Sequence, residues 1–317
     1  MNMESHLYIQ VTFLDSVIIF GMGKKHRKKR KVYPMRIVIL VLLVLLCAEM
    51  IALLIQAVFS KEDNTETAVS ADTETETERF STPEPTPDLR IRHSYDYDNI
   101  TMINGILYYE DENYTSELVI DVSAHQTWID WDIAAWDGVG AAMVRVGYRG
   151  YESGEINEDE QFVQNMENTA AAGISTGVYF FTQAINEEEA VEEAEYVLEK
   201  IRDYDVEGPI AIDMELSSDH DRINGLTVNE KTAIVLAFAR KIKEAGYTPM
   251  VYGSASWLTT DYHLEEIQQE CEIWVANYDT DELPFEFAFN MWQYNPEGFV
   301  YGIDASVDLN IRMIPKD

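Results

Sequence analysis

The sequence predicts an α/β fold over residues 118–317, in which parallel strands connected by crossover helices form a sheet or a barrel. Short apolar runs of strand length alternate there with amphipathic runs of helix length. About eight strand candidates fit into 200 residues, which indicates a compact (β/α) barrel. Helical patterns become rare after Gly253, so the last helices of such a barrel are expected to be missing. A doubly wound open sheet is the competing architecture, and the absence of a GxGxxG turn after the first strand weakens it.

Two helices are clear from their apolar faces, one from Ala190 to Ile201 and one from Val235 to Ala245. Gly246 stands where a glycine commonly ends a helix. The expected strands are, in order, Leu118–Val122, Ala141–Val146, Thr176–Phe181, Ile210–Met214, Pro249–Tyr252, Ile273–Ala276, Asn290–Tyr294 and a last one near Val300–Val307.

The N-terminal region predicts a membrane anchor. Eight Lys and Arg side chains lie within residues 1–36, and Ile37–Phe59 follows as a 23-residue apolar run, long enough for a helix that crosses a bilayer. The excess of cations before the run predicts that the N-terminus lies in the cytoplasm and the rest of the chain outside. A cleaved signal peptide is the alternative, although its apolar core would usually be shorter.

Two further segments connect the anchor to the barrel. Residues 60–92 contain TETETE and TPEPTP and too few large apolar side chains to fold, so they predict a disordered stalk. Residues 93–117 predict a short β lead-in, because Asn104-Gly105 is a hairpin-type turn signal before an apolar run.

The composition excludes several classes of protein. The formal net charge of −34 argues against nucleic-acid binding, which needs a basic surface. Cys47 and Cys271 are the only cysteines, which excludes a disulfide scaffold and a cysteine-based zinc site. HExxH, GxSxG and P-loop motifs are absent from the sequence, and we expect neither a metal nor a cofactor.

Acidic side chains follow several strand candidates, where the active sites of barrel enzymes lie. Asp213 and Glu215 are two apart at the end of one strand, so both should point to the same face. Two carboxyl groups at close range cannot both ionise cheaply, which raises one pKa and suits protonation of a glycosidic oxygen. A chance pair in an acidic protein is the alternative. Asp121 could equally be a turn or cap residue, and Asp304 and Asp308 could each form turns.

Aromatic residues gather near the same strand ends. They could line a glycan groove, because sugar rings stack on aromatic faces, or they could simply belong to the core. The candidates are Tyr148, Tyr179, Phe181, Tyr252, Trp274, Tyr278, Trp292 and Tyr294, with Gln293 between the last two.

Ten stretches in this region, in order along the chain, resemble the glycoside hydrolase family 25 lysozymes, the Chalaropsis-type N-acetylmuramidases. They are IDVSAHQ (120–126), IDW (129–131), MVRVGYRGY (143–151), DEQFVQNMENTAAAGI (159–174), GVYFFTQA (177–184), PIAIDME (209–215), VYGS (251–254), IWVANYD (273–279), MWQY (291–294) and GIDASVDLN (302–310).

The resemblance implies a modified TIM-like (β/α)5(β)3 barrel and cleavage of the β-1,4 bond between N-acetylmuramic acid and N-acetylglucosamine in peptidoglycan. It makes Glu215 the general acid and Asp213 its partner, and it places Asp121 and Asp308 in the same acidic cleft. One departure is Thr127, where many family members have glycine.

The resemblance also implies peptidoglycan glycan strands as a partner, so the part of the chain outside the membrane should face the cell wall. The apolar run adds the bilayer as a partner through residues 37–59, and the chain is expected to be a monomer. A chitinase-like enzyme and an inactive, anchored wall-binding module remain the alternatives.

Overall fold

The computed structural model describes residues 88–216, 218, 220–278 and 285–316. The predicted cytoplasmic segment, the predicted transmembrane helix and all but the end of the predicted stalk lie outside these ranges. Within them, every helix is too short or too polar to cross a membrane.

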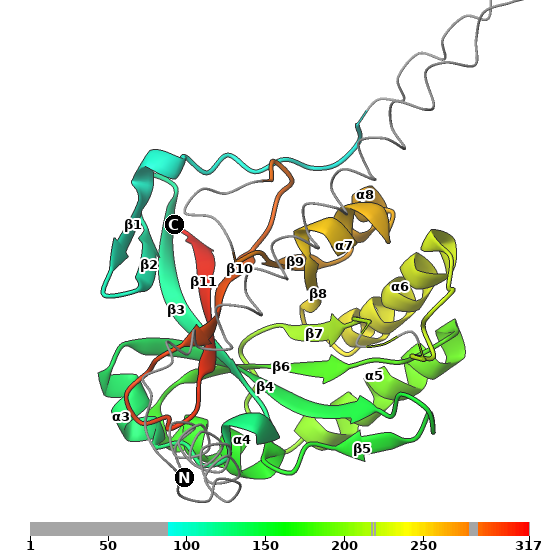
Figure 1. The fold of residues 1–317 in the computed structure, drawn as a ribbon, viewed down its shortest axis with the longest axis horizontal. Coiled ribbons are helices and arrows are strands. Elements are labelled where there is room, and N and C mark those ends of the chain that lie inside the picture. The colour runs from blue at the N-terminus through cyan, green and yellow to red at the C-terminus, as the bar shows by residue number, and fades with distance from the viewer. Residues whose placement is uncertain (1–87, 217, 219, 279–284, 317) are drawn as a thin grey trace, which may run out of the picture. The chain divides into compact units, whose positions relative to one another are not determined.

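Eight strands form a closed barrel (Figure 1). Their order around the barrel is β3-β11-β10-β9-β8-β7-β6-β4, and pairing between β4 and β3 completes the ring. This closure excludes the open doubly wound sheet. The strands are β3 (Tyr114–Val122), β4 (Val139–Arg149), β6 (Ser175–Phe181), β7 (Ile210–Asp213), β8 (Pro249–Ser254), β9 (Glu272–Ala276), β10 (Met291–Gly298) and β11 (Val307–Pro315).

Helices follow the first five barrel strands and not the last three, so the described chain has five βα units and then β9, β10 and β11. Both helices expected from the sequence are present. Local signals explain their bounds: Asn186 caps α5, Thr227 and Glu230 form a capping box on α6, and Gly246 takes a positive φ of 92° just after α6. The helices are α3 (Trp131–Trp136), α4 (Phe162–Ala172), α5 (Glu187–Ile201), α6 (Val228–Glu244), α7 (Ala255–Thr260) and α8 (Leu264–Ile267).

The last strand is displaced from its expected position. The sequence suggested Val300–Val307, whereas β11 begins at Val307 and runs antiparallel to both β10 and β3. Asp308, Asn310 and Arg312 alternate with the apolar residues of β11, a strand pattern that a search for continuous apolar runs does not detect. Because β11 is antiparallel, its N-terminal end lies at the same rim as the C-terminal ends of its neighbours.

Two apolar layers hold the barrel together. The outer faces of the strands pack against the helices in the larger cluster, whereas a smaller cluster fills the barrel interior. This interior cluster consists of Val119, Ala141, Met143, Tyr179, Ala211, Met250, Tyr252, Trp274, Ala276 and Met291. It closes the barrel beneath the polar residues at the rim.

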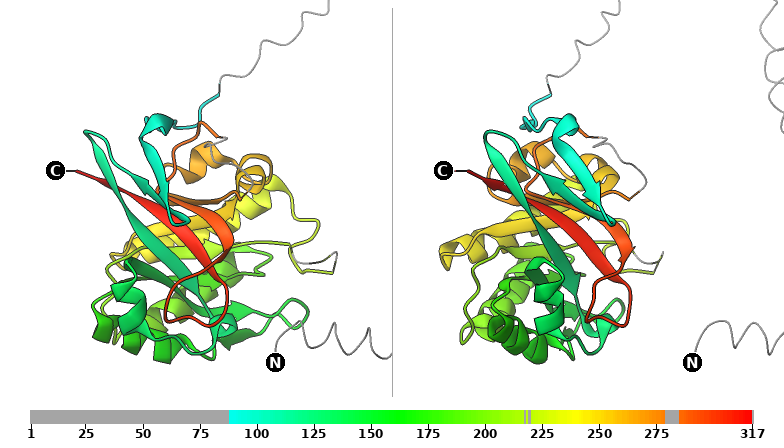
Figure 2. Two further views of the ribbon diagram at one scale, coloured as in Figure 1. Left: turned by 60° about the vertical axis from the view of Figure 1, so that its left-hand side comes forward. Right: turned by 90° about the vertical axis from the view of Figure 1, so that its left-hand side faces the viewer.

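The lead-in contains the hairpin that Asn104-Gly105 indicates. Strand β1 (Ile100–Ile103) pairs with β2 (Ile106–Tyr109), and both turn residues take positive φ, 54° and 83°. The hairpin lies beside β3 (Figure 2). Its β2 buries Leu107 and Tyr109, so the lead-in shares the core of the barrel.

Residues 88–92, which the sequence assigned to the stalk, lie against the folded domain. Ile91 O accepts a hydrogen bond from Ala288 N at 2.7 Å, and the Gln268 side chain bonds both main-chain groups of Ile91. Arg92 forms an isolated β-bridge with Phe287. The folded domain therefore extends toward the N-terminus at least as far as Ile91.

Candidate active site

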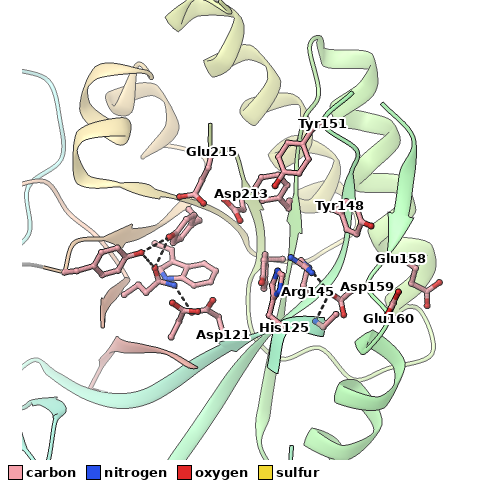
Figure 3. Close-up of a pocket in the computed structure, with 18 residues that line it drawn as sticks. Asp121, His125, Arg145, Tyr148, Tyr151, Glu158, Asp159, Glu160, Asp213 and Glu215 are labelled. Atoms are coloured by element: carbon pink, nitrogen blue, oxygen red, sulfur yellow. Dashed lines mark hydrogen bonds and ion pairs between the residues drawn. The ribbon is translucent and has the colours of Figure 1, made fainter. Parts of the chain in front are cut away.

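A cleft of about 680 Å³ opens at the barrel rim formed by the C-terminal ends of the parallel strands (Figure 3). Its size suits a small ligand or a short stretch of polymer. Four acids, eight aromatic residues and Gln293 were expected here from the sequence, and eleven of these thirteen line the cleft: Asp121, Tyr148, Tyr179, Phe181, Asp213, Glu215, Tyr252, Trp274, Tyr278, Gln293 and Asp308.

Trp292 does not reach the cleft, which corrects the expectation. Successive side chains of a strand point to opposite faces, so Gln293 and Met291 face inward and Trp292 faces outward. Trp292 is 1% exposed, and its Nε1 donates to Asn277 O. Tyr294 also packs in the outer layer, where its hydroxyl accepts a hydrogen bond from Leu107 N.

Asp213 and Glu215 lie near one another on the same side of the cleft (Figure 3). Strand β7 ends at Asp213, so Glu215 stands two residues beyond the strand and yet faces the same space. Gln183 helps to hold it there, because its Nε2 donates to the main-chain oxygen of Glu215. Asp213 is only 7% exposed, and its Oδ1 has no hydrogen-bond partner among the described residues.

Asp121 and Asp308 lie on adjacent strands as direct register partners of β3 and β11. Asp121 Oδ2 accepts hydrogen bonds from Gln293 Nε2 and Asn310 Nδ2, both at 2.8 Å. Asp304, in contrast, is exposed outside the cleft. The structure thus brings Asp308 to the acids and leaves Asp304 away from them.

All four carboxyl groups have raised pKa values, and burial is the largest cause for each. Burial raises the pKa of Asp121 to about 6, against the hydrogen bonds from Asn310 and Gln293, which lower it. Burial and the charge of Asp121 raise the pKa of Asp308 to about 8. Burial and then the charge of Glu215 hold the pKa of Asp213 well above its ordinary value. Burial and the charge of Asp121 raise the pKa of Glu215. The acids therefore differ in proton affinity, as paired acid–base catalysis requires.

Tyrosine hydroxyls order one wall of the cleft. Tyr252 and Tyr278 both donate to Gln293 Oε1, at 2.8 and 2.5 Å, and Gln293 in turn donates to Asp121. Trp274 packs edge-on against Tyr252 and Tyr179, and its Nε1 donates to Asn310 Oδ1. This chain of contacts fixes Asp121 relative to the aromatic wall.

Several lining residues were missed from the sequence, chiefly Arg145 and Asp159, together with His125, Tyr151, Glu158 and Glu160. Arg145 and Asp159 lie within two of the stretches that resemble family 25, MVRVGYRGY and DEQFVQNMENTAAAGI, but the resemblance assigned a role to neither residue. No group of three or more His, Cys, Asp or Glu within the described ranges is arranged to hold a metal ion.

Comparisons with known proteins agree with this geometry. The model of Glycosyl hydrolases family 25 matches residues 120–303, more than half of the chain. The uncharacterized protein YegX of Escherichia coli O157:H7 is 25% identical over 198 residues, covering 61% of this chain and 68% of YegX.

Solved structures are similar as well. The modular autolysin LytC of Streptococcus pneumoniae, solved in complex with a synthetic peptidoglycan ligand, is 26% identical with a TM-score of 0.56; the match covers 68% of this chain and 52% of LytC. This chain thus spans about half the length of LytC. The bacterial lysozyme of Streptomyces coelicolor shares the fold, at 23% identity and a TM-score of 0.51, over 61% of this chain and 90% of that one. By the family match, the chain belongs to glycosyl hydrolase family 25.

Proposed function

We propose that this protein is a peptidoglycan hydrolase that cleaves the β-1,4 bond between N-acetylmuramic acid and N-acetylglucosamine. The observation that carries the proposal is the meeting of four carboxyl groups of unequal proton affinity in one cleft. Family membership and the peptidoglycan ligand of LytC support the choice of substrate.

In this proposal Glu215 is the general acid. It is half-buried and faces the cleft, and its raised pKa favours the protonated form that an acid must have at the start of the reaction. Its proton passes to the glycosidic oxygen while the bond from that oxygen to the anomeric carbon breaks, and the leaving sugar departs as an alcohol. The Glu215 carboxylate then takes a proton from the water that completes hydrolysis.

Asp213 has the second role. Its carboxyl group lines the cleft near Glu215, where it can orient the 2-acetamido group of the substrate. The acetamido oxygen then attacks the anomeric carbon to give an oxazoline, which water opens with overall retention. Direct attack by a water that a carboxylate activates, with inversion, is the other route. NMR of the first-formed product anomer distinguishes the two routes.

The test compares Glu215→Gln with Glu297→Gln in the full-length chain on purified peptidoglycan. Glu297 is exposed and does not line the cleft, so its variant should keep the wild-type rate. Glu215→Gln should lose at least about a hundredfold in turnover, the lower range for a lost proton-transfer group. Mass analysis of the wild-type products identifies the sugar at the new reducing end. N-acetylglucosamine at that end, or near-wild-type turnover of Glu215→Gln, would contradict the proposal.

Two alternatives make different predictions. A chitinase-like enzyme would release dye from labelled chitin and not from labelled peptidoglycan. An inactive wall-binding module would sediment with peptidoglycan and release dye from neither. The presence of all four acids in the cleft favours an active enzyme.

We also propose that residues 37–59 hold the protein in the cell membrane with residues 60–317 outside. The apolar run and the basic segment before it support this arrangement. Mass spectrometry of the membrane fraction tests it, because a mature chain that begins after Phe59 would contradict a retained anchor.

A further inference from the structure

The cleft continues beyond the four acids toward β4 and β5 (Ile156–Glu158), where its lining changes character. Arg145 is the only Lys or Arg among the described residues that line the cleft. It stands among Asp159, Tyr148 and His125, and on one side it approaches Asp213 closely enough that its charge lowers the pKa of that carboxyl (Figure 3). A cation at this place in an otherwise acidic cleft needs a physical explanation.

An irregularity in β4 brings Arg145 and Tyr148 to the same face. Strict alternation along a strand would put residues three apart on opposite faces. The register against β6 shifts between Arg145 and Gly147, so that Arg145 pairs with Tyr179 and Tyr148 pairs with Phe181. Val146 is the extra residue of this β-bulge. As a result, the guanidinium of Arg145 lies 5.6 Å from the centroid of the Tyr148 ring.

Asp159 holds Arg145 in place from behind. Arg145 Nε donates to Asp159 Oδ2 at 2.7 Å, and the Asp159 side chain is completely buried. Asp159 is itself fixed by the main-chain N–H groups of Ala124 and Gln161, at 3.0 and 2.9 Å. The orientation of the guanidinium is therefore set before any ligand arrives.

The outer edge of the guanidinium is left available. Nη1 and Nη2 of Arg145 donate to no group in the described part of the chain, and the side chain is 15% exposed, at the cleft. A planar guanidinium with two free terminal nitrogens binds paired or single acyl oxygens. A purely structural arginine would use these nitrogens on the protein, as Arg149 does with Gly154, Glu189 and Glu192.

We propose that Arg145 is a substrate-binding residue whose terminal nitrogens bind an acyl oxygen of a substituent on the sugar in the cleft. This inference rests on the proposed function, which supplies two such substituents. The 2-acetamido group occurs on both sugars of peptidoglycan and in chitin, whereas the lactyl group occurs only on muramic acid. Binding of the lactyl group would let the enzyme prefer peptidoglycan over chitin.

The test measures binding in the full-length Glu215→Gln protein, which should not turn over its ligand. The probes are the disaccharide of N-acetylglucosamine and N-acetylmuramic acid, and chitobiose, each titrated by calorimetry. Arg145→Lys keeps a positive charge beside Asp159 and loses the planar fork, and Arg145→Gln removes the charge. Arg202→Gln, at an exposed site outside the cleft, is the matched control. Thermal unfolding of each variant separates loss of binding from loss of fold.

We expect Arg145→Lys to unfold near the parent temperature and yet bind the muramic disaccharide at least about tenfold more weakly, the loss typical of a hydrogen bond to a charged group. If Arg145→Lys binds chitobiose as well as its parent does, the oxygen that Arg145 binds is that of the lactyl group. If the variant loses affinity for chitobiose to the same extent, the oxygen is that of the acetamido group. Unchanged binding of both probes by a folded Arg145 variant overturns the inference. If the Arg145 variants lose binding as expected but the wild-type protein leaves peptidoglycan intact, the proposed function is refuted and the binding site at Arg145 is not.

Discussion

Arg149 offers a sharp test of how buried charge stabilises this barrel. It lies on the outer face of β4, is 4% exposed, and its Nε donates to Glu193 Oε1 at 2.6 Å. Glu193 is completely buried on α5, and its Oε2 accepts a hydrogen bond from Thr182. Arg149→Met would leave the Glu193 carboxyl buried without its cation.

The expected cost depends on pH. Burial raises the pKa of Glu193 from 4.5 to about 7, even though Arg149 and Thr182 lower it. The pKa of Glu193 is higher in the folded protein than in the unfolded one. The stability that Glu193 contributes is therefore complete below about pH 4.5 and is lost as the pH rises through 7. Breaking a buried pair by removing one partner costs about 3–5 kcal/mol when the remaining group is charged. At about pH 5 Glu193 is neutral and needs no cation. The loss of unfolding free energy caused by Arg149→Met should therefore be smaller there by about 1.4 kcal/mol or more, the equivalent of a tenfold change in proton affinity.

The assay is thermal unfolding of the full-length chain, followed by circular dichroism at about pH 5 and about pH 8. For a domain of this size, we expect Arg149→Met to lower Tm by about 10 °C at the higher pH and by clearly less at the lower one. Arg202→Met removes an exposed pair with Asp203 and should change Tm by only about 2 °C at either pH. Adding Glu193→Gln to Arg149→Met should remove the pH dependence. An equal loss for Arg149→Met at both pH values would refute the reasoning.

Three further variants test other parts of the structure. Thr127→Gly should raise the free energy of unfolding by about 1 kcal/mol, because Thr127 holds φ 58° and ψ −116°, a strained conformation for a β-branched residue; a loss measured in urea would contradict this. Gly147→Ala should cost about 1–3 kcal/mol in the same assay, since its Cβ would lie 2.3 Å from Asn157 O; an unchanged midpoint would count against the close approach of β4 and β5. Asp308→Asn should keep kcat/KM within about tenfold of wild type at about pH 6, because a carboxyl group of pKa about 8 is neutral there, like the amide. Above pH 8 the kcat/KM of the variant should depart from that of the wild type. A hundredfold loss at about pH 6 would instead assign Asp308 a proton-transfer role.

The sequence predicts seven of the eight barrel strands because each of the seven contains a short apolar run next to a turn or helix signal, whereas β11 alternates polar and apolar residues. Asp121 and Asp213 come directly after such runs, so their place at the rim follows from the fold class alone. Choosing Asp308 over Asp304 needed the resemblance, since both residues look like turn formers in isolation. The structure decides between them because β11 starts at Val307 and pairs Asp308 with Asp121.

Other features depend on contacts between distant segments, which periodicity does not encode. The bulge at Val146 changes which β4 side chains face the cleft, and only the register against β6 reveals it. Trp292 was assigned to the cleft by its neighbours in the sequence, although alternation within β10 turns it outward. The sequence argument gave repulsion between Asp213 and Glu215 as the cause of one raised pKa. Burial contributes more for both residues, and the charge that raises the pKa of Glu215 is that of Asp121.

The position of β11 between β3 and β10 has a consequence for biosynthesis. The ring is joined by pairing between segments nearly 190 positions apart, as in the bond from Asn310 to Asp121, and such distant pairings form slowly. Until the ribosome has added residues 307–315, β3 lacks one neighbour, and the cleft lacks Asp308 and the amide that holds Asp121. A nascent chain therefore carries an unfinished site, and its hydrolytic activity should appear only after this final strand has emerged and docked.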